Sequence, residues 1–248
     1  MACRTGCCKS TTGDPMIEAL QFEFMRNALV AGLLVSVICG IMGALVVVNR
    51  IVFLSGGIAH ASYGGIGLSF FLGIPYLFGT IGFSLLAALV MAFVSMKAKH
   101  RADTIIGVIW ALGMAFGIIM IDLTPGYNVD LMSYLFGSIL TVPVSDLIII
   151  AALDAVIITL VLLFYKELLA ISFDATFARI ENVPVDAIYM VLLCMIALTV
   201  VMMMRVVGLI MVIAMLTMPA AISGQFVKDM KRMMILSSVL GILFTTTG

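Results

Sequence analysis

The chain has 248 residues, of which 64% are hydrophobic and 10% are charged, and its 13 basic side chains balance 13 acidic ones. A mean hydropathy of +1.29 excludes a soluble globular domain, and a net charge of zero gives no reason to expect a nucleic-acid partner. The chain also contains no GxxxxGKS/T loop, so it does not bind nucleotide phosphates through that motif. These properties predict a helical membrane protein.

Residues 1–15 are more polar than the rest and carry cysteines at positions 3, 7 and 8. These cysteines do not have the spacing of a zinc site, and no secretory apolar segment with a cleavage site follows them. We predict a disordered N-terminal extension over residues 1–15 and a single transmembrane domain over residues 16–248.

Apolar segments recur along that domain, separated by short polar breaks. About 20 apolar residues are needed to cross a hydrocarbon core some 30 Å thick. The apolar run 131–140 is about half that length, so we interpret it as a re-entrant half-helix. The predicted fold class is therefore an all-α polytopic membrane protein with about eight transmembrane helices and one half-helix. Seven predicted spans cover residues 17–48, 53–72, 76–96, 104–121, 147–165, 188–204 and 206–223, and an eighth begins near residue 233.

Basic side chains indicate the orientation of the spans, because they are enriched in cytoplasmic loops. Four of the polar breaks contain most of the basic residues. These four breaks lie on one side of the membrane only if the run 131–140 enters and leaves by the same face. The cytoplasm then lies on that side, and the N-terminus lies outside. Nine of the 13 basic residues occupy these breaks: Arg50; Lys97, Lys99 and Arg101; Lys166 and Arg179; and Lys228, Lys231 and Arg232.

The half-helix indicates a translocation pathway, because non-spanning backbone at membrane depth is tolerated only inside protein or beside a wet cavity. Asp122, Asp130 and Asp146 flank it on the outer side, with no Lys or Arg between them in the sequence. This pattern favours an electronegative mouth that attracts cations. Ordinary polar loop ends are the alternative.

The segment FLSGGIAHASYGGIGLSF is the most unusual in the chain. On a helix, Gly57, His60, Gly64 and Gly67 share one face, and small residues let transmembrane helices approach closely. A histidine on that face points at protein or a polar cavity rather than lipid, and neutral imidazole binds divalent transition metals well. His60 is therefore a candidate metal ligand. The alternative is an imidazole that hydrogen-bonds a backbone carbonyl between helices.

Asp154 lies in the middle of the apolar run LIIIAALDAVIITLVLL. An acid at that depth is unfavourable and needs a partner. It either pairs with His60 around a cation or hydrogen-bonds a neighbouring helix, and the residues alone leave both possibilities open.

The cytoplasmic break after the fifth predicted span has helical character of its own. Ser172 or Asp174 can cap its start, and Asn182 can end it in the left-handed conformation. Phe173 and Phe177 lie one turn apart on this helix, and exposed aromatics in such a place suggest docking to a partner. A short helix lying on lipid headgroups is the alternative.

Ordered motifs in five parts of the chain resemble the zinc/manganese-type permeases of bacterial ABC importers. The resemblance runs from about residue 20 to the end, and the ordered set is highly specific although each motif alone is weak. The motifs are VVVNRIVFLSGGIAHASYGGIGL at 46–68, ADTIIGVIWALGMAFGI at 102–118, VDLMSYLFGSILTV at 129–142, FYKELLAISFDATFARIENVPV at 164–185 and MRVVGLIMVIAMLTMPAAIS at 204–223.

The resemblance implies a type II ABC-importer-like permease in the plasma (inner) membrane of a prokaryote. Its implied partners are a second permease copy, two ATPase subunits below, and a metal-binding lipoprotein or periplasmic protein above. The chain itself then binds no cofactor and is not an enzyme, while the ATPase hydrolyses ATP and a divalent metal ion is carried. The helix at about 172–182 matches the coupling helix that seats in the ATPase, through Phe173, Asp174, Phe177, Ala178 and Arg179.

Two features depart from the family pattern. His60 matches a histidine in the translocation path of many relatives, but those relatives carry an aspartate four residues earlier, where this chain has Gly56. We hypothesise that Asp154 supplies the missing carboxylate. The chain also stops at Gly248, whereas relatives continue into one more span, so we expect a fragment or a permease that lacks its final helix.

The function predicted from the sequence is that of a permease subunit in an ATP-driven importer of zinc, manganese or iron. A proton-coupled secondary metal transporter working through Asp154 is the alternative, and it would need neither a coupling helix nor an ATPase. The absence of an HExxH motif argues against an intramembrane metalloenzyme.

Overall fold

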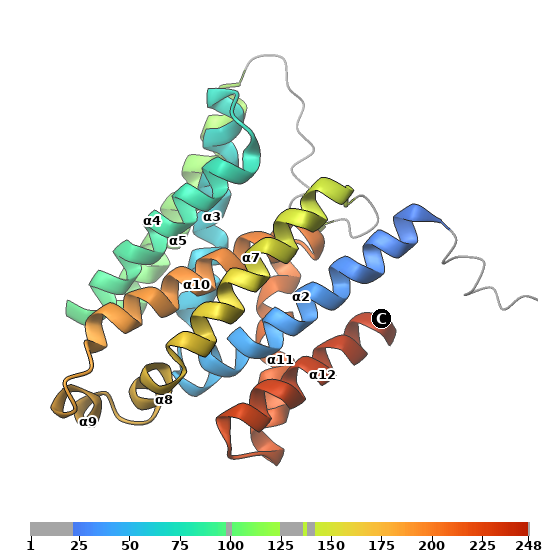
Figure 1. The fold of residues 1–248 in the computed structure, drawn as a ribbon. Helices are drawn as coiled ribbons and strands as arrows, with labels where there is room; N and C mark the ends of the chain where they lie inside the picture. Colours follow the sequence, from blue (N-terminus) through green and yellow to red (C-terminus); the bar gives the residue numbers. More distant parts are fainter. Residues whose placement is uncertain (1–21, 98–100, 125–135, 138–141, 248) are drawn as a thin grey trace, which may run out of the picture.

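A computed structural model describes residues 22–97, 101–124, 136–137 and 142–247. Within these residues the chain folds into ten helices with no strand (Figure 1). The predicted N-terminal extension, residues 1–15, lies outside the described residues, as does most of the predicted half-helix. The helices are α2 (Glu23–Val48), α3 (Val52–Leu72), α4 (Tyr76–Lys97), α5 (Ala102–Asp122), α7 (Val144–Leu163), α8 (Tyr165–Phe173), α9 (Ala175–Ile180), α10 (Val185–Val206), α11 (Leu209–Phe226) and α12 (Met230–Thr247).

Eight of these helices coincide with the predicted spans, although α2 begins at Glu23 rather than at residue 17. In the described part of the chain, six are long and apolar enough to cross a membrane, namely α2, α4, α5, α7, α10 and α11. Helix α3 has 21 residues but is rich in glycine and serine, and α12 has 18 residues with basic side chains in its first turn. The protein is therefore an all-helical, multi-span membrane protein.

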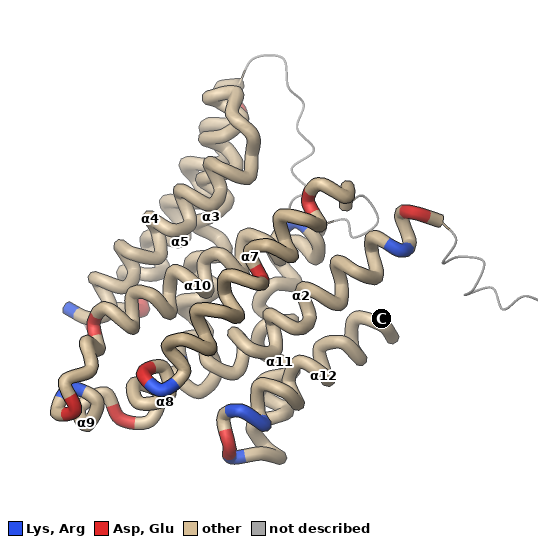
Figure 2. The backbone as a smooth tube through the Cα atoms, viewed as in Figure 1, with Lys and Arg blue, Asp and Glu red and all other residues tan. Residues whose placement is uncertain are grey.

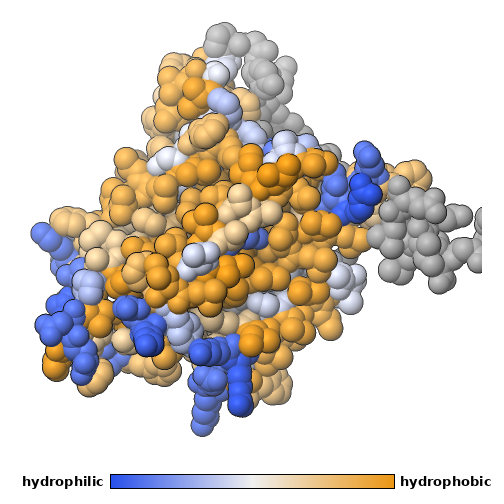
Figure 3. Space-filling view, in the orientation of Figure 1, coloured by the Kyte–Doolittle hydropathy of each residue, from blue (hydrophilic) through white to orange (hydrophobic). Residues whose placement is uncertain are grey.

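Helices α2 and α10 form the centre of the bundle. In each of them 67% of the most apolar window is buried inside the protein, compared with 22% in α5 and α7. The outer helices expose large apolar side chains instead, and Figure 3 shows these as a broad hydrophobic surface between more polar ends. A surface of this kind is stable in lipid and would aggregate in water.

Helices α3 and α5 pack through their backbones rather than through side chains. A Cβ atom on Gly113 would lie 2.7 Å from the Cα of Ala61, and one on Gly117 would lie 2.6 Å from the carbonyl oxygen of Tyr63. Gly67 faces Gly117 in the same way. This seam confirms the predicted close packing by small residues, and its register makes α3 and α5 parallel.

Most charged residues gather at the two ends of the bundle (Figure 2), and Asp154 in the middle of α7 is an exception. The end of α2, the end of α4, the start of α5, both short helices α8 and α9, and the start of α12 meet at what we call the basic end. Because α5 runs parallel to α3, its last residues lie at the opposite end. Helix α7 also starts at the opposite end, where its Asp146 contacts Tyr76 at the start of α4. The end of α5 and the start of α7, which flank residues 123–143, therefore lie at the same end of the bundle.

Candidate functional site

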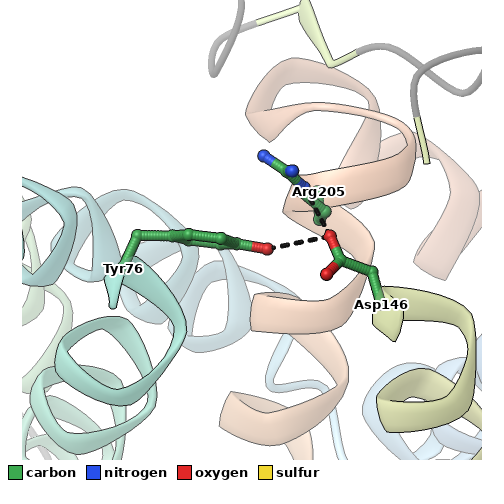
Figure 4. Close-up of polar contacts among 3 residues, drawn as sticks. All are labelled: Tyr76, Asp146 and Arg205. Atoms are coloured by element: carbon green, nitrogen blue, oxygen red, sulfur yellow. Dashed lines mark hydrogen bonds and ion pairs between the residues drawn. The ribbon is translucent and has the colours of Figure 1, made fainter. Parts of the chain in front are cut away.

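A polar cluster joins three helices at the opposite end. Asp146 in the first turn of α7 accepts hydrogen bonds at one carboxylate oxygen, Oδ2, from Arg205 Nε at 3.0 Å and from the Tyr76 hydroxyl at 3.2 Å (Figure 4). The Arg205 guanidinium also lies over the Tyr76 ring, 4.7 Å from its centroid. We call this group the clasp. It combines a charge-assisted hydrogen bond with a cation–π contact.

The turn that follows Arg205 makes a second close contact. Gly208, between α10 and α11, has a φ of +83°, and Gly137 has a φ of +70°. A Cβ atom on either glycine would overlap the backbone of the other segment. Glycine is required at both positions, because other residues rarely adopt positive φ and any side chain would separate the two segments. The end of α10 thus contacts α7 through Arg205, and the turn after α10 contacts the segment at residues 136–137.

The clasp involves one of the three acids of the predicted mouth, which stays a prediction for the other two. The sequence pattern grouped three acids without a basic neighbour, but Arg205 neutralises Asp146 from a distant part of the chain. Asp122 is exposed at the end of α5, and Asp130 lies outside the described residues. Neither Tyr76 nor Arg205 was singled out from the sequence, although an arginine at the end of an apolar span was a signal that a carboxylate lay nearby.

His60 lies in the middle of α3 and stacks on Trp110 of α5, with ring centroids 4.1 Å apart and planes 15° apart. Its Nδ1 atom is buried and has no hydrogen-bond partner in the described structure. Gly56, one turn earlier, is buried against Ile213 of α11, where a Cβ atom would lie 3.1 Å away. The imidazole is thus half-buried and held by ring stacking rather than by the backbone carbonyl that the alternative interpretation required.

Asp154 is 4% exposed, and its Oδ1 atom has no hydrogen-bond partner among the described residues. Its electrostatic neighbour is Cys39 of α2, whose Sγ atom lies 3.0 Å from the Sδ atom of Met203 on α10. Asp154 therefore faces the centre of the bundle, as expected for an acid in an apolar helix.

The structure does not bring His60 and Asp154 into one ligand set. His60 faces α5, Asp154 faces α2, and their helices α3 and α7 make at most marginal contact. Among the described residues, no group of three or more His, Cys, Asp or Glu side chains lies close enough together to hold a metal ion. Any shared role of the two residues needs a different conformation or another chain.

The predicted cytoplasmic helix is divided into two. Ser172 and Phe173 belong to α8, and α9 then begins at Ala175. Asp174 caps α9 by accepting hydrogen bonds from the backbone N–H groups of Thr176 and Phe177. These donors hold the pKa of Asp174 below its usual range. The chain leaves the helix through Asn182, with a φ of +59°, as predicted.

Helix α9 and the last residue of α8 expose large apolar side chains. Phe173, Phe177 and Ile180 are 71%, 57% and 74% exposed. Arg179 forms an exposed ion pair of 2.7 Å with Asp186 at the start of α10. Ala178 is fully buried, so it packs α9 onto the bundle and cannot belong to a docking surface, which corrects that part of the prediction.

A cavity of about 530 Å³ opens beside α9 at the basic end. Its walls come from α4, α5, α9 and α10, and they include Ser95, Asp103, Thr176 and Asp186. One wall is therefore α9 itself. Displacement of α9 would change the shape of this cavity directly.

The fold and the apolar surface define a helical membrane-spanning protein with a short helix exposed at its basic end. The chain matches the ABC 3 transport family over residues 21–248. An uncharacterized membrane protein of Synechocystis is 57% identical over 95% of this chain and 84% of its own length. The manganese import system permease protein ScaB of Streptococcus gordonii is 33% identical, over 89% of this chain and 79% of its own length.

A solved structure shows the same fold. PsaBC from Streptococcus pneumoniae, in complex with a Fab, superposes with a TM-score of 0.82 at 34% identity, covering 92% of this chain and 82% of that one. This chain therefore belongs to the ABC 3 transport family. It is a multi-pass membrane permease subunit of an ABC transporter and not the ATP-hydrolysing subunit, which implies partner ATPases and a binding protein.

Proposed function

We propose that this chain is the permease of an ATP-driven importer of divalent transition-metal ions, with zinc, manganese and iron as the candidate cargoes. The observation that carries the proposal is the family match over residues 21–248, to which relatives described as manganese permeases belong. In the proposed assembly, two copies of the permease bind two ATPase subunits on the cytoplasmic side. An extracytoplasmic protein delivers the metal on the other side.

The proposed topology has eight spans and a re-entrant segment within residues 123–143. The shared location of the end of α5 and the start of α7 supports it, because a full span between them would separate those ends. The basic end then faces the cytoplasm, as the enrichment of Lys and Arg in cytoplasmic loops requires. We call the opposite end the outer end from here on.

The proposed docking surface is Phe173, Phe177 and Ile180, with Arg179 beside them. These three large apolar side chains, one at the end of α8 and two on α9, are exposed, and such a patch favours a protein contact over solvent. ATP-driven closure of the ATPases would displace α9 and with it one wall of the cytoplasmic cavity. Such a displacement shifts the balance between inward- and outward-open states of the permease.

His60 is proposed to line the cargo path, because its buried Nδ1 atom is free of hydrogen bonds in the described structure and suits a borderline metal ion. Asp154 is proposed as the carboxylate that replaces the one missing at Gly56, acting in a state other than the one described. Weak, few-ligand coordination suits transport, since a tight site would trap the ion.

Metal uptake into vesicles that contain the permease and its ATPase tests both assignments. We expect His60→Ala to abolish ATP-dependent uptake and Asp154→Asn to reduce it at least about tenfold, the loss expected when a metal ligand or its orienting partner is removed. Trp110→Phe is the matched control, because it keeps an aromatic ring under His60. If Asp154→Asn transports normally while His60→Ala does not, Asp154 has no part in the path.

A further inference from the structure

We propose that the Tyr76–Asp146–Arg205 clasp is a releasable lock on the outer end of the permease, operated through α10 from the docking helix α9. The proposal rests on the proposed ATPase contact for its driving force but not for the lock itself. The lock assigns gating roles to three residues that touch neither His60 nor Asp154 in the described contacts.

The clasp is placed to hold α7 against the rest of the bundle. Helix α7 packs mainly on α2, only lightly on α10, and has just 22% of its most apolar window buried. Tyr76 and Asp146 are the hydrogen-bonded connection between the starts of α4 and α7. Among the described residues, α4 and α7 share few contacts, so removal of the clasp is expected to loosen the outer end of α7 from α4.

The clasp is also exposed enough for its two charged side chains to separate. The Arg205 side chain is 31% exposed and that of Asp146 is 17% exposed, so water can solvate both charges when they separate. A fully buried pair would carry a large penalty for the same step. An exposed pair contributes little to holding two helices together. Arg179–Asp186, with both side chains more than 60% exposed, is such a pair. The half-buried clasp lies between these limits.

Helix α10 connects the lock to the docking helix. It begins at Val185, three residues after the end of the α9 turn at Asn182, and carries Arg205 in its last turn. Its 22 residues span roughly 33 Å at 1.5 Å per residue. Because an unbroken helix is stiff along its axis, a displacement of α9 tilts or shifts α10 and withdraws Arg205 from Asp146.

Charge reversal tests the lock by hydrogen–deuterium exchange in the permease–ATPase assembly in lipid nanodiscs, with and without a non-hydrolysable ATP analogue. The variants are Asp146→Arg, Arg205→Asp and the double swap. Without nucleotide, we expect each single reversal to speed exchange at the starts of α4 and α7 about tenfold or more, since the lost hydrogen bond is charge-assisted. The double swap should restore slow exchange in part, because it re-forms the ion pair with the charges exchanged but loses the Tyr76 hydrogen bond and the cation–π contact.

The comparison with and without the ATP analogue shows whether the clasp opens during the transport cycle or is a permanent structural contact. In the wild-type protein the ATP analogue should raise exchange at the outer end toward the level of the single reversals, which should not respond further. Arg232→Asp is the control, because it makes the same charge change in an exposed pair with Asp229 at the basic end and should leave the outer end unchanged.

Three outcomes overturn the lock: unchanged exchange in both single reversals, no restoration in the double swap, or single reversals that still respond fully to nucleotide. Where a reversal does not assemble, Arg205→Gln and Asp146→Asn replace it, and they should raise outer-end exchange several-fold. Exchange in α9 reports separately on the ATPase contact. If the ATPase leaves α9 unprotected, the proposed function fails, while the nucleotide-free comparison still decides the lock.

Discussion

The α3–α5 seam and the clasp hold helices together in opposite ways. In the seam, the backbones of α3 and α5 meet directly at Gly67, Gly113 and Gly117, with no room for a side chain. In the clasp, the side chains of α4, α7 and α10 reach across to one another through a single carboxylate. The first contact is apolar and continuous, and the second is polar and confined to one point.

The difference indicates which parts of the permease can move. A glycine seam is held by many small dispersion contacts, and sliding or separating the two helices would break all of them at once. We therefore expect α3 and α5 to move as one body. A half-buried ion pair exchanges protein partners for water at moderate cost, so the outer end of α7 can separate and return. Alternating access needs both properties in one bundle.

The largest expected effect comes from breaking the seam. Gly117→Ala forces a Cβ atom to within 2.6 Å of the Tyr63 carbonyl oxygen, and overpacking of this kind destabilises by about 1–3 kcal/mol. Gly107→Ala on the same helix has nothing within 4 Å of the new atom, and the lower flexibility of alanine should stabilise the helix by roughly 0.5–1 kcal/mol. Thermal unfolding in detergent should move in opposite directions for the two variants, and equal shifts would contradict the seam.

The next largest effect is expected at α9, the helix through which the ATPase is proposed to move the outer end of the permease. Asp174→Ala deletes the cap of α9 and should uncouple ATP hydrolysis from transport without unfolding the bundle, whereas Asp174→Asn keeps a capping oxygen and should retain coupling. Because the pKa of Asp174 is lowered, the ionised cap is present at neutral pH and weakens only as the pH falls through that lowered value. Transport per ATP hydrolysed in vesicles is the measurement, and loss of coupling in Asp174→Asn would count against a capping role.

The smallest effect divides the clasp into its parts. Tyr76→Phe keeps the ring beneath Arg205 and removes only the hydroxyl that donates to Asp146. A hydrogen bond to a charged group contributes about 1.5–3 kcal/mol, and this one is long at 3.2 Å and part-buried, so exchange at the start of α7 should rise by roughly tenfold, less than in Arg205→Asp. Tyr76→Ala removes the ring as well and should exceed Tyr76→Phe. Equal effects of the two variants would mean that the ring contributes nothing.

Much of the fold was predictable because lipid imposes simple rules on sequence. Segment length and hydropathy placed eight helices to within three residues at their described boundaries apart from the start of α2. Small residues three and four apart identified the face of α3 that packs closely, whereas its partner α5 came from the structure. Asn182 was identified as the end of the cytoplasmic helix because asparagine adopts the left-handed conformation more readily than most other non-glycine residues.

The candidate sites were less predictable, since they depend on which helices become neighbours. Arg205 and Asp146 are 59 residues apart, and no local pattern links them. His60 and Asp154 looked like partners because both are polar groups in apolar runs, but α3 and α7 are not packed together.

By itself, the sequence determined that this is a membrane protein, which segments form its long helices, and which end of the bundle carries most of the positive charge. These properties follow from composition and periodicity, which act within one segment. Only the tertiary structure decided that Ala178 is buried, that α8 and α9 are separate, and that Asp146 binds Arg205. Contacts between distant segments depend on the packing of all helices at once, and a single segment does not contain that information.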